Sequence, residues 1–221
     1  MNMAKIPDSP KIYHITHVDN LPRIVHAGEI LCDAKMLALG AGCTVVGMSK
    51  IKQRRLEEIE VSCHRGTKVG DYVPFYFCPR SVMLYILHRG NHAEVAYQGG
   101  QQPIVHLQAD LRAVLEWAEA HGRRWAFSDR NAGAHLANFF KRIEDLEEVN
   151  WGAVASTDFR DSFVKEGKQA EFLMHGSLPW ERIERIGVVS AGIQAQVVAA
   201  IGSGGSAGKK PLVTVEPGWY Y

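Results

Sequence analysis

An acidic residue, Glu171, stands in an otherwise apolar, strand-like segment, the run GKQAEFLMH at 167–175. Burying a carboxylate is costly unless it is paired or hydrogen-bonded, so this placement predicts either a cleft or an ion pair. Gln169 lies two residues earlier, and residues two apart on a strand point to the same face. We therefore expect Gln169 and Glu171 to face one pocket, where a carboxylate could accept a proton or stabilise positive charge.

Further polar and aromatic side chains lie in strand-like or helical contexts and are candidates for the same pocket. Each also has an ordinary structural explanation, because aromatic residues commonly pack in cores and basic pairs commonly face water on a helix. Only Glu171 is hard to explain by packing alone. The candidates are His14, His17, Tyr72, Tyr76 and one of Arg54 and Arg55.

The elements that must position these residues are short and mixed. Helices and strands do not alternate strictly, which favours an α+β fold over a doubly wound sheet. We expect one domain spanning residues 1–221, with central mixed or antiparallel sheets and surrounding helices. Strands are expected at 11–16, 59–61, 71–77, 103–107, 124–127, 153–157, 169–174, 185–189 and 212–215; helices at 19–28, 49–55, 80–87, 110–120, 132–142 and 192–201; and loops at 33–48 and in the glycine-rich run 202–210.

Composition excludes a histone-like binder of nucleic acid and argues against a disulfide-rich or metal-binding protein. The 25 basic and 24 acidic side chains give a net charge of +1, so attraction for a polyanion must come from local patches. The four cysteines lack CxxC spacing and the ten histidines form no HExxH pair, so we expect reduced thiols and no metal site. No secretion signal or membrane-spanning segment is visible, which predicts a cytoplasmic protein without membrane contact.

Several segments together resemble one family, the DarT DNA ADP-ribosyltransferase toxins. The Gln-x-Glu pair on a strand resembles the catalytic motif of ADP-ribosyltransferases in general, and DYVPFYF is the most specific of the longer matches. These run the length of the chain: IYHITHVDNL at 12–21, IKQRR at 51–55, DYVPFYFCPRSVML at 71–84, AFSDRNA at 126–132, TDFR at 157–160, KQAEFL at 168–173 and the C-terminal GWYY.

The resemblance implies that NAD is consumed as a substrate, without a metal. Glu171 would stabilise the oxocarbenium-like transition state as nicotinamide departs and could take the proton from the attacking base. Arg54 would match the catalytic arginine if IKQRR is aligned without a gap, whereas a shift of one residue would give that role to Arg55; Arg54 is preferred. The residues implied to contact NAD are His14, Thr16, His17, Asn20, Arg54, Tyr72, Phe75, Tyr76 and Met83.

The resemblance also implies a single-stranded DNA substrate, modified on a base. The residues expected to contact this substrate are Gln169, Asn131, Arg160, Lys165 and Lys168, although the charged ones could equally be solvated loop residues. Asn131 stands where thymine-modifying members carry histidine. Thymine is the first expectation for the target base and guanine the second.

Two other functions stay open on the sequence alone. One is an ADP-ribosyltransferase or NAD glycohydrolase that acts on RNA or protein, and the other is a catalytically silent nucleic-acid-binding module. A toxin of this family also implies a partner, a macrodomain antitoxin of the DarG type, which removes the modification.

Overall fold

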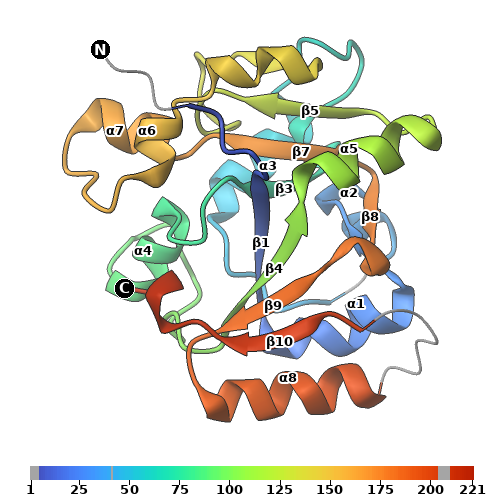
Figure 1. Ribbon diagram of the computed structural model, residues 1–221, viewed down its shortest axis with the longest axis vertical. Coiled ribbons are helices and arrows are strands. Elements are labelled where there is room, and N and C mark those ends of the chain that lie inside the picture. The colour runs from blue at the N-terminus through green and yellow to red at the C-terminus, as the bar shows by residue number, and fades with distance from the viewer. Residues whose placement is uncertain (1–4, 41, 204–209) are drawn as a thin grey trace.

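A mixed eight-stranded β-sheet forms the centre of the protein in a computed structural model that describes residues 5–40, 42–203 and 210–221 (Figure 1). The strand order is β10-β9-β4-β1-β3-β7-β5-β6, and among these pairs only β9 and β10 run parallel. A second sheet pairs β2 with β8. The strands are β1 (Lys11–His17), β2 (Glu29–Leu31), β3 (Tyr72–Tyr76), β4 (Ile104–Asp110), β5 (Trp125–Ser128), β6 (Phe139–Phe140), β7 (Glu171–His175), β8 (Ser177–Pro179), β9 (Arg185–Val188) and β10 (Leu212–Val215).

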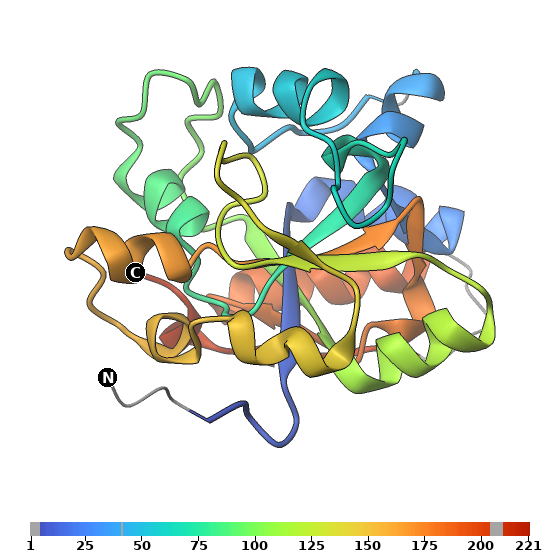
Figure 2. The same cartoon turned by 90° about the horizontal axis from the view of Figure 1, so that it is seen from above.

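Helices cover both faces of this sheet, which confirms the expected α+β class. Figure 2 shows α3 on one side of β5 and the 3-10 segment 143–148 on the other. At the other end of the sheet, α8 lies along β10 and next to α1 (Figure 1). The helices are α1 (Leu21–Ala27), α2 (Asp33–Ala38), α3 (Ser49–Glu57), α4 (Val82–Arg89), α5 (Leu111–Ala120), α6 (Trp151–Ala155), α7 (Ser162–Gly167) and α8 (Ala191–Ser203).

Two neighbouring strands, β3 and β7, divide their side chains between the core and the opposite face. Phe75 and Phe172 are register partners and both lie in the main hydrophobic cluster, with ring centroids 6.2 Å apart. Tyr76 is the register partner of Glu171. Because side chains alternate along a strand, Tyr76 and Glu171 must face the side away from that cluster. The pairing of β3 with β7 therefore places the acidic residue on the α3 side of the sheet.

The segment 132–142 is not the helix expected from the sequence. It continues a loop and then forms β6, which pairs with β5 in an antiparallel hairpin. Asp129 holds the loop closed by accepting hydrogen bonds from the backbone N–H of Asn138 at 3.1 Å and from its side-chain amide at 2.9 Å. Phe140 then stacks on Phe127. These tertiary contacts outweigh the helical propensity of the alanines.

Residues 153–157 also differ from the expected strand, because residues 151–155 form α6. Asn150 caps this helix through a 2.9 Å bond from the backbone N–H of Ala153. A short apolar run does not by itself distinguish a buried strand from a buried helix. Two further helices, α2 and α7, were expected as loops, and most of the glycine-rich run 202–210 lies outside the described residues.

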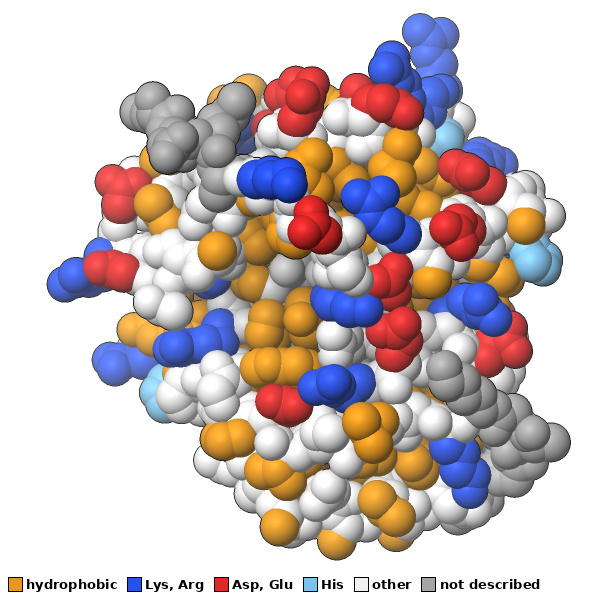
Figure 3. All heavy atoms as spheres, in the orientation of Figure 1, with side chains coloured by type: hydrophobic (Ala, Val, Ile, Leu, Met, Phe, Trp, Pro, Cys, Tyr) orange, Lys and Arg blue, Asp and Glu red, His pale blue; other side chains and the backbone are white. Residues whose placement is uncertain are grey.

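The visible surface carries both signs of charge. Figure 3 shows Lys and Arg side chains interspersed with Asp and Glu, and apolar side chains gathered over the α8 end. Among the described residues, no helix combines the length and apolar character that crossing a membrane requires. The mixture of positive and negative side chains on this face agrees with the net charge of +1.

Candidate active site

Glu171 forms a two-point ion pair with Arg55. Nη1 of Arg55 donates to Oε1 at 3.1 Å, and Nη2 donates to Oε2 at 2.8 Å. The Glu171 side chain is 1% exposed and that of Arg55 is 13% exposed. A guanidinium that engages both carboxylate oxygens fixes the plane of the carboxylate as well as its position.

Backbone groups complete the surroundings of Glu171. The N–H of Ala132 donates to Oε1 at 2.9 Å, and the Ser128 hydroxyl accepts the N–H of Glu171 at 3.3 Å. Burial alone would lower the pKa of Arg55, but the adjacent carboxylate of Glu171 raises it above its ordinary value. The guanidinium of Arg55 is therefore held in its charged form.

A pocket of about 420 Å³ opens next to this ion pair. Its volume lies within the usual range for small-molecule sites. Arg55 and Tyr76 line it from the ion-pair side, and side chains of α1, β2, α2, α3, α4 and the segment 43–48 line the rest. Seven residues expected from the sequence line this pocket: His14, Thr16, Asn20, Tyr76, Met83, Asn131 and Gln169.

Asn20 fixes the loop that forms one wall of the pocket. Its side-chain amide donates to the carbonyl of Thr44 at 3.0 Å and accepts the N–H of Thr44 at 3.0 Å. The same amide donates to the hydroxyl of Thr16 at 3.0 Å. A single buried asparagine therefore links the end of β1 to the segment 43–48, which lines the pocket.

Burial keeps two ring side chains of the pocket neutral. Burial lowers the pKa of His14, whose Nδ1 donates to the carbonyl of Pro74 at 2.9 Å. Burial, together with the negative charge of Glu171, raises the pKa of Tyr76 well above its ordinary value. The phenol of Tyr76 can therefore act as a hydrogen-bond donor beside the carboxylate.

A chain of amide hydrogen bonds orients Gln169 and Asn131. The Gln169 amide donates to the carbonyl of Lys165 at 3.0 Å, while its Oε1 accepts from Nδ2 of Asn131 at 3.4 Å. Oδ1 of Asn131 accepts the N–H of Gly133 at 2.7 Å. A Cβ at Gly133 would lie 2.9 Å from that oxygen, so a larger residue at 133 would displace the Asn131 side chain.

Comparison with known proteins identifies the family. The family model described as "ssDNA thymidine ADP-ribosyltransferase, DarT" matches residues 13–221. The chain belongs to the DarT family. Both the family and the enzyme class expected from the sequence, DNA ADP-ribosyltransferase, are confirmed.

Individual relatives match over nearly their whole length. The DNA ADP-ribosyl transferase of Thermus sp. (strain 2.9) is 36% identical over 97% of this chain and 98% of its own. The structure of Thermus sp. 2.9 DarT in complex with ADP-ribosylated ssDNA has a TM-score of 0.89 at 34% identity and covers 99% of this chain and 100% of that one. The same DarT in complex with NAD+ has a TM-score of 0.79 at 32% identity and covers 98% and 100%.

The preference for Arg54 over Arg55 is wrong for contact with Glu171. On the helix α3, successive side chains point about 100° apart. Arg54 therefore turns away, with its Nε 3.3 Å from Glu58 and its Nη2 3.4 Å from the Nε2 of His135. Arg54 is not among the residues that line the pocket.

Three other residues expected to contact NAD lie outside the pocket lining. Phe75 is completely buried in the core, as its position next to Tyr76 on a strand requires. Tyr72 shares the face of Tyr76 but lies four residues along β3, where its hydroxyl contacts that of Thr67 at 3.0 Å. His17 accepts the N–H of Asp19 and packs edge-on against Tyr97.

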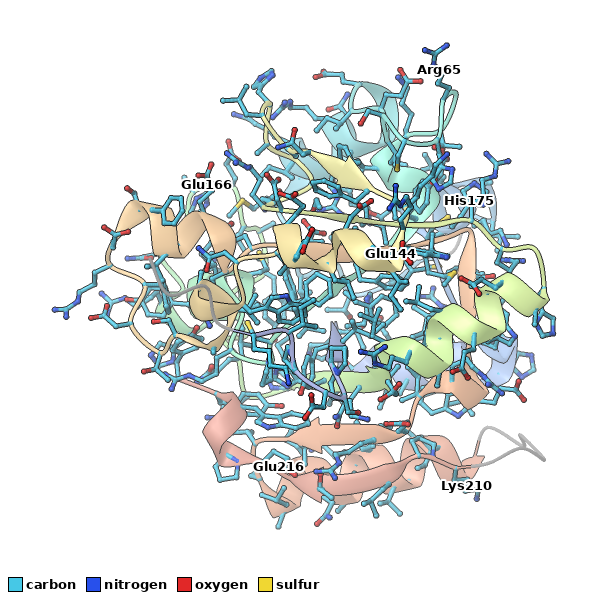
Figure 4. The ribbon with its side chains drawn as sticks, turned by 45° about the horizontal axis from the view of Figure 1, so that its top comes forward. Arg65, Glu144, Glu166, His175, Lys210 and Glu216 are labelled. Atoms are coloured by element: carbon cyan, nitrogen blue, oxygen red, sulfur yellow. The ribbon has the colours of Figure 1, made fainter. Side chains whose placement is uncertain are left out.

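The residues expected to contact DNA differ in exposure. Lys168 is 3% exposed, and its ammonium donates to the carbonyls of Val154 at 3.0 Å and Ser156 at 2.7 Å, so its predicted DNA contact is wrong. Lys165 and Arg160 are exposed, and Arg160 pairs with Asp158. In Figure 4, Glu166 on α7 and His175 at the end of β7 lie on opposite sides of the β7 region, so Lys165, next to Glu166 on α7, lies toward the Glu171 end.

Sequence reasoning missed the backbone N–H of Ala132 and the 43–48 wall. No residue type signals a backbone donor, but the buried polar Asn20 after β1 was a usable signal for a clamped loop.

Among the described residues, no group of three or more His, Cys, Asp or Glu side chains could hold a metal ion.

Proposed function

We propose that this protein transfers ADP-ribose from NAD to a thymine base in single-stranded DNA and releases nicotinamide. The observation that carries the proposal is the Glu171 carboxylate, which is held by Arg55 beside a pocket of about 420 Å³. Membership of the DarT family supports this use of the site, since a Thermus relative was solved with NAD+ and with ADP-ribosylated ssDNA.

In the proposed reaction, Glu171 stabilises the positive charge that develops on the ribose when its bond to nicotinamide breaks. A carboxylate next to an oxocarbenium-like centre acts in this way in glycosidases. Because Glu171 is 1% exposed, the substrate must separate Arg55 from at least one carboxylate oxygen to reach it. Arg55 then keeps the other oxygen oriented and is free to hold a phosphate or hydroxyl of NAD.

The acceptor base completes the step. A ring nitrogen of the base attacks the anomeric carbon, the new carbon–nitrogen bond forms, and the nitrogen's proton passes to Glu171. Gln169 and Asn131 lie at the same end of the pocket and orient the base through the amide groups fixed above. Lys165 and Arg160, both exposed, contact the phosphates of the strand.

NAD binds as a substrate and not as a recycled cofactor. The sequence lacks the glycine fingerprint of a dinucleotide-binding Rossmann domain, and the pocket offers a different set of groups. The proposed contacts come from His14, Thr16, Asn20, Tyr76 and Met83, which all line the cavity. Tyr76 supplies a flat face for the nicotinamide ring.

Thymine is preferred to guanine as the target base because the description of the matching family names thymidine. The asparagine at 131, where thymine-modifying members carry histidine, keeps guanine as the second candidate. Both bases offer a ring nitrogen that carries a proton, so the carboxylate chemistry suits either.

Incubation of the purified protein with labelled NAD tests the proposal. Label should move to single-stranded DNA, and mass spectrometry of nucleosides should locate it on thymidine. The same assay with Glu171→Gln should give no labelled DNA while circular dichroism stays native. Label found only on RNA or on protein would overturn the proposed acceptor, and an unchanged rate in Glu171→Gln would remove this residue from the mechanism.

We also propose that the enzyme acts as a toxin controlled by a macrodomain antitoxin. Unrestrained modification of DNA bases would block replication, so a cell that makes this protein needs an enzyme that reverses the reaction. Expression of the intact chain should arrest growth, and Glu171→Ala or co-expression of a macrodomain hydrolase should relieve the arrest. Growth that is unaffected by an active enzyme would contradict the toxin role. A cytoplasmic location and a single domain over 1–221 stay predictions.

A further inference from the structure

A group of aromatic rings, the α4 platform, lies on the side of α4 that faces away from the pocket. Its rings are Tyr85, Phe159 and Tyr221. The ring centroid of Tyr85 lies 5.3 Å from that of Phe159 and 5.1 Å from that of Tyr221. The centroids of Phe159 and Tyr221 are 6.0 Å apart. All three side chains are only partly buried.

Arg80 lies over the platform without an acidic partner. Its guanidinium carbon is 4.4 Å from the centre of the Tyr221 ring. Within the described part of the chain, no carboxylate pairs with Arg80, and its buried Nε has no hydrogen-bond partner. A partly buried cation stacked on an aromatic ring is a ready site for a phosphate or a base.

The platform is a fixed structure and not a loose surface group. The side-chain amide of Gln101 donates to the carbonyl of Tyr221 and accepts its N–H at 3.1 Å. The Tyr221 hydroxyl donates to the carbonyl of Arg80 at 2.8 Å, which ties the ring to the start of α4. Burial raises the pKa of this hydroxyl, so the donor stays protonated. Rings held in this way lose little conformational entropy when a ligand stacks on them.

The platform lies close enough to the pocket to contact the same strand. Met83 and Ile86 line the pocket from α4, whereas Tyr85, between them in sequence, belongs to the platform. Figures 1 and 2 both show α4, α7 and the C-terminus on one side of the molecule. A helix with its side chains is about 10 Å across. About three stacked nucleotides span that distance, at about 3.4 Å each.

We propose that Tyr85, Phe159, Tyr221 and Arg80 form a second nucleotide subsite, which binds an unpaired base and phosphate of the DNA strand about three nucleotides from the modified base. Aromatic faces accept any base, so this subsite adds affinity without reading sequence. The inference rests on the proposed function, because it takes the strand in the platform to be the strand whose base enters the pocket.

Binding of short and long oligonucleotides separates the two sites. Fluorescence anisotropy without NAD should show that the wild-type chain binds the 12-mer dT12 more tightly than dT2, which is too short to reach both sites. Phe159→Leu should weaken dT12 binding about tenfold, the effect of losing one base stack, and leave dT2 binding unchanged. Phe159→Trp keeps an aromatic face and should stay within about twofold of wild type. Arg80→Gln should also reduce the salt dependence of dT12 binding by about one phosphate contact.

Trp117→Leu is the matched control, because Trp117 is also a partly exposed aromatic but lies on α5, away from α4. Equal dT12 affinity in Phe159→Leu and Trp117→Leu would overturn the subsite, as would an equal loss on dT2 and dT12. The binding assay needs no catalysis. If the proposed function were wrong, the wild-type protein would bind dT12 but would transfer no label from NAD to DNA.

Discussion

Arg55 and Glu171 are 116 positions apart in the chain, yet the guanidinium of one spans both carboxylate oxygens of the other. The pair joins α3 to the first residue of β7 and lies next to the pocket. A buried pair of this kind is seldom the most stabilising choice for a core, since apolar residues of similar size often do as well. Its place beside a ligand-sized cavity favours a catalytic reason for keeping it.

Arg55→Gln should abolish transfer of ADP-ribose, whereas Arg54→Gln should retain most of it. Arg55 contacts the carboxylate and lines the pocket, while Arg54 contacts Glu58 and His135. We expect a loss of at least about a hundredfold for Arg55→Gln, comparable to the removal of one electrostatic group from an active site. Initial rates with labelled NAD and single-stranded DNA measure this, and equal losses in the two variants would contradict it.

A double variant separates catalysis from stability. Removal of one partner of a buried pair costs about 3–5 kcal/mol, because the other charge is left uncompensated. Arg55→Gln should therefore lower the free energy of unfolding, and adding Glu171→Gln should restore part of it. Activity should stay absent in the double variant. If activity returned with stability, the pair would be structural only.

The same substitution should affect different properties at Lys168 and Lys165: stability at Lys168 and DNA binding at Lys165. Lys168→Met leaves the carbonyls of Val154 and Ser156 without their donor, so the free energy of unfolding should fall by about 2 kcal/mol. For a chain of this size that corresponds to about 4–8 °C in the melting temperature. Lys165→Met, at an exposed position, should change stability by less than about 0.5 kcal/mol but weaken DNA binding. A stable Lys168→Met protein would contradict the structural role.

The sequence predicted Glu171 well because a carboxylate in an apolar strand has few explanations. The predicted ion pair is present, since Arg55 holds Glu171, whereas of Gln169 and Glu171 only Gln169 lines the pocket itself. The choice between Arg54 and Arg55 was not accessible in the same way. It depends on the rotation of α3 about its own axis, which packing sets, and the polar sequence SKIKQRRLE carries little periodic signal for it.

Phe75 and residues 132–142 were mispredicted for a similar reason. Both Phe75 and Tyr76 suit an aromatic pocket by residue type, but strand alternation allows only one of them to face it, and the β3–β7 register decides which. The segment 132–142 has helical composition, but the hydrogen bonds of Asp129 and the pairing of β6 with β5 fix it as a loop and a strand. Non-local contacts decided each case.

Asn131 should influence which base is modified. Its Oδ1 is held by the N–H of Gly133, so its amide presents a fixed donor toward Gln169 and the pocket. Asn131→Ala removes that donor and should lower transfer to DNA about tenfold without slowing the hydrolysis of NAD. Asn131→His should raise the ratio of modified thymidine to modified guanosine, measured by mass spectrometry of nucleosides. An unchanged ratio in both variants would show that Asn131 does not read the base.

The buried imidazole of His106 should make the protein less stable in acid. This residue is completely buried, its Nε2 donates to the carbonyl of Pro79 at 3.0 Å, and burial lowers its pKa from 6.5 to about 4. Since the unfolded chain binds the proton more readily, the stabilising effect is complete above about pH 6.5 and is lost as the pH falls toward 4.

Each unit of pKa difference corresponds to about 1.4 kcal/mol, so the loss should approach about 3 kcal/mol at pH 4. Urea unfolding of the wild type and of His106→Gln, measured between pH 7 and 4, isolates this effect. The variant keeps a donor for Pro79 but has no titrating group there, and it leaves His14, whose pKa is also lowered by burial, in place. Its free energy of unfolding should fall less steeply in this window. Parallel curves would show that His106 does not sense the pH.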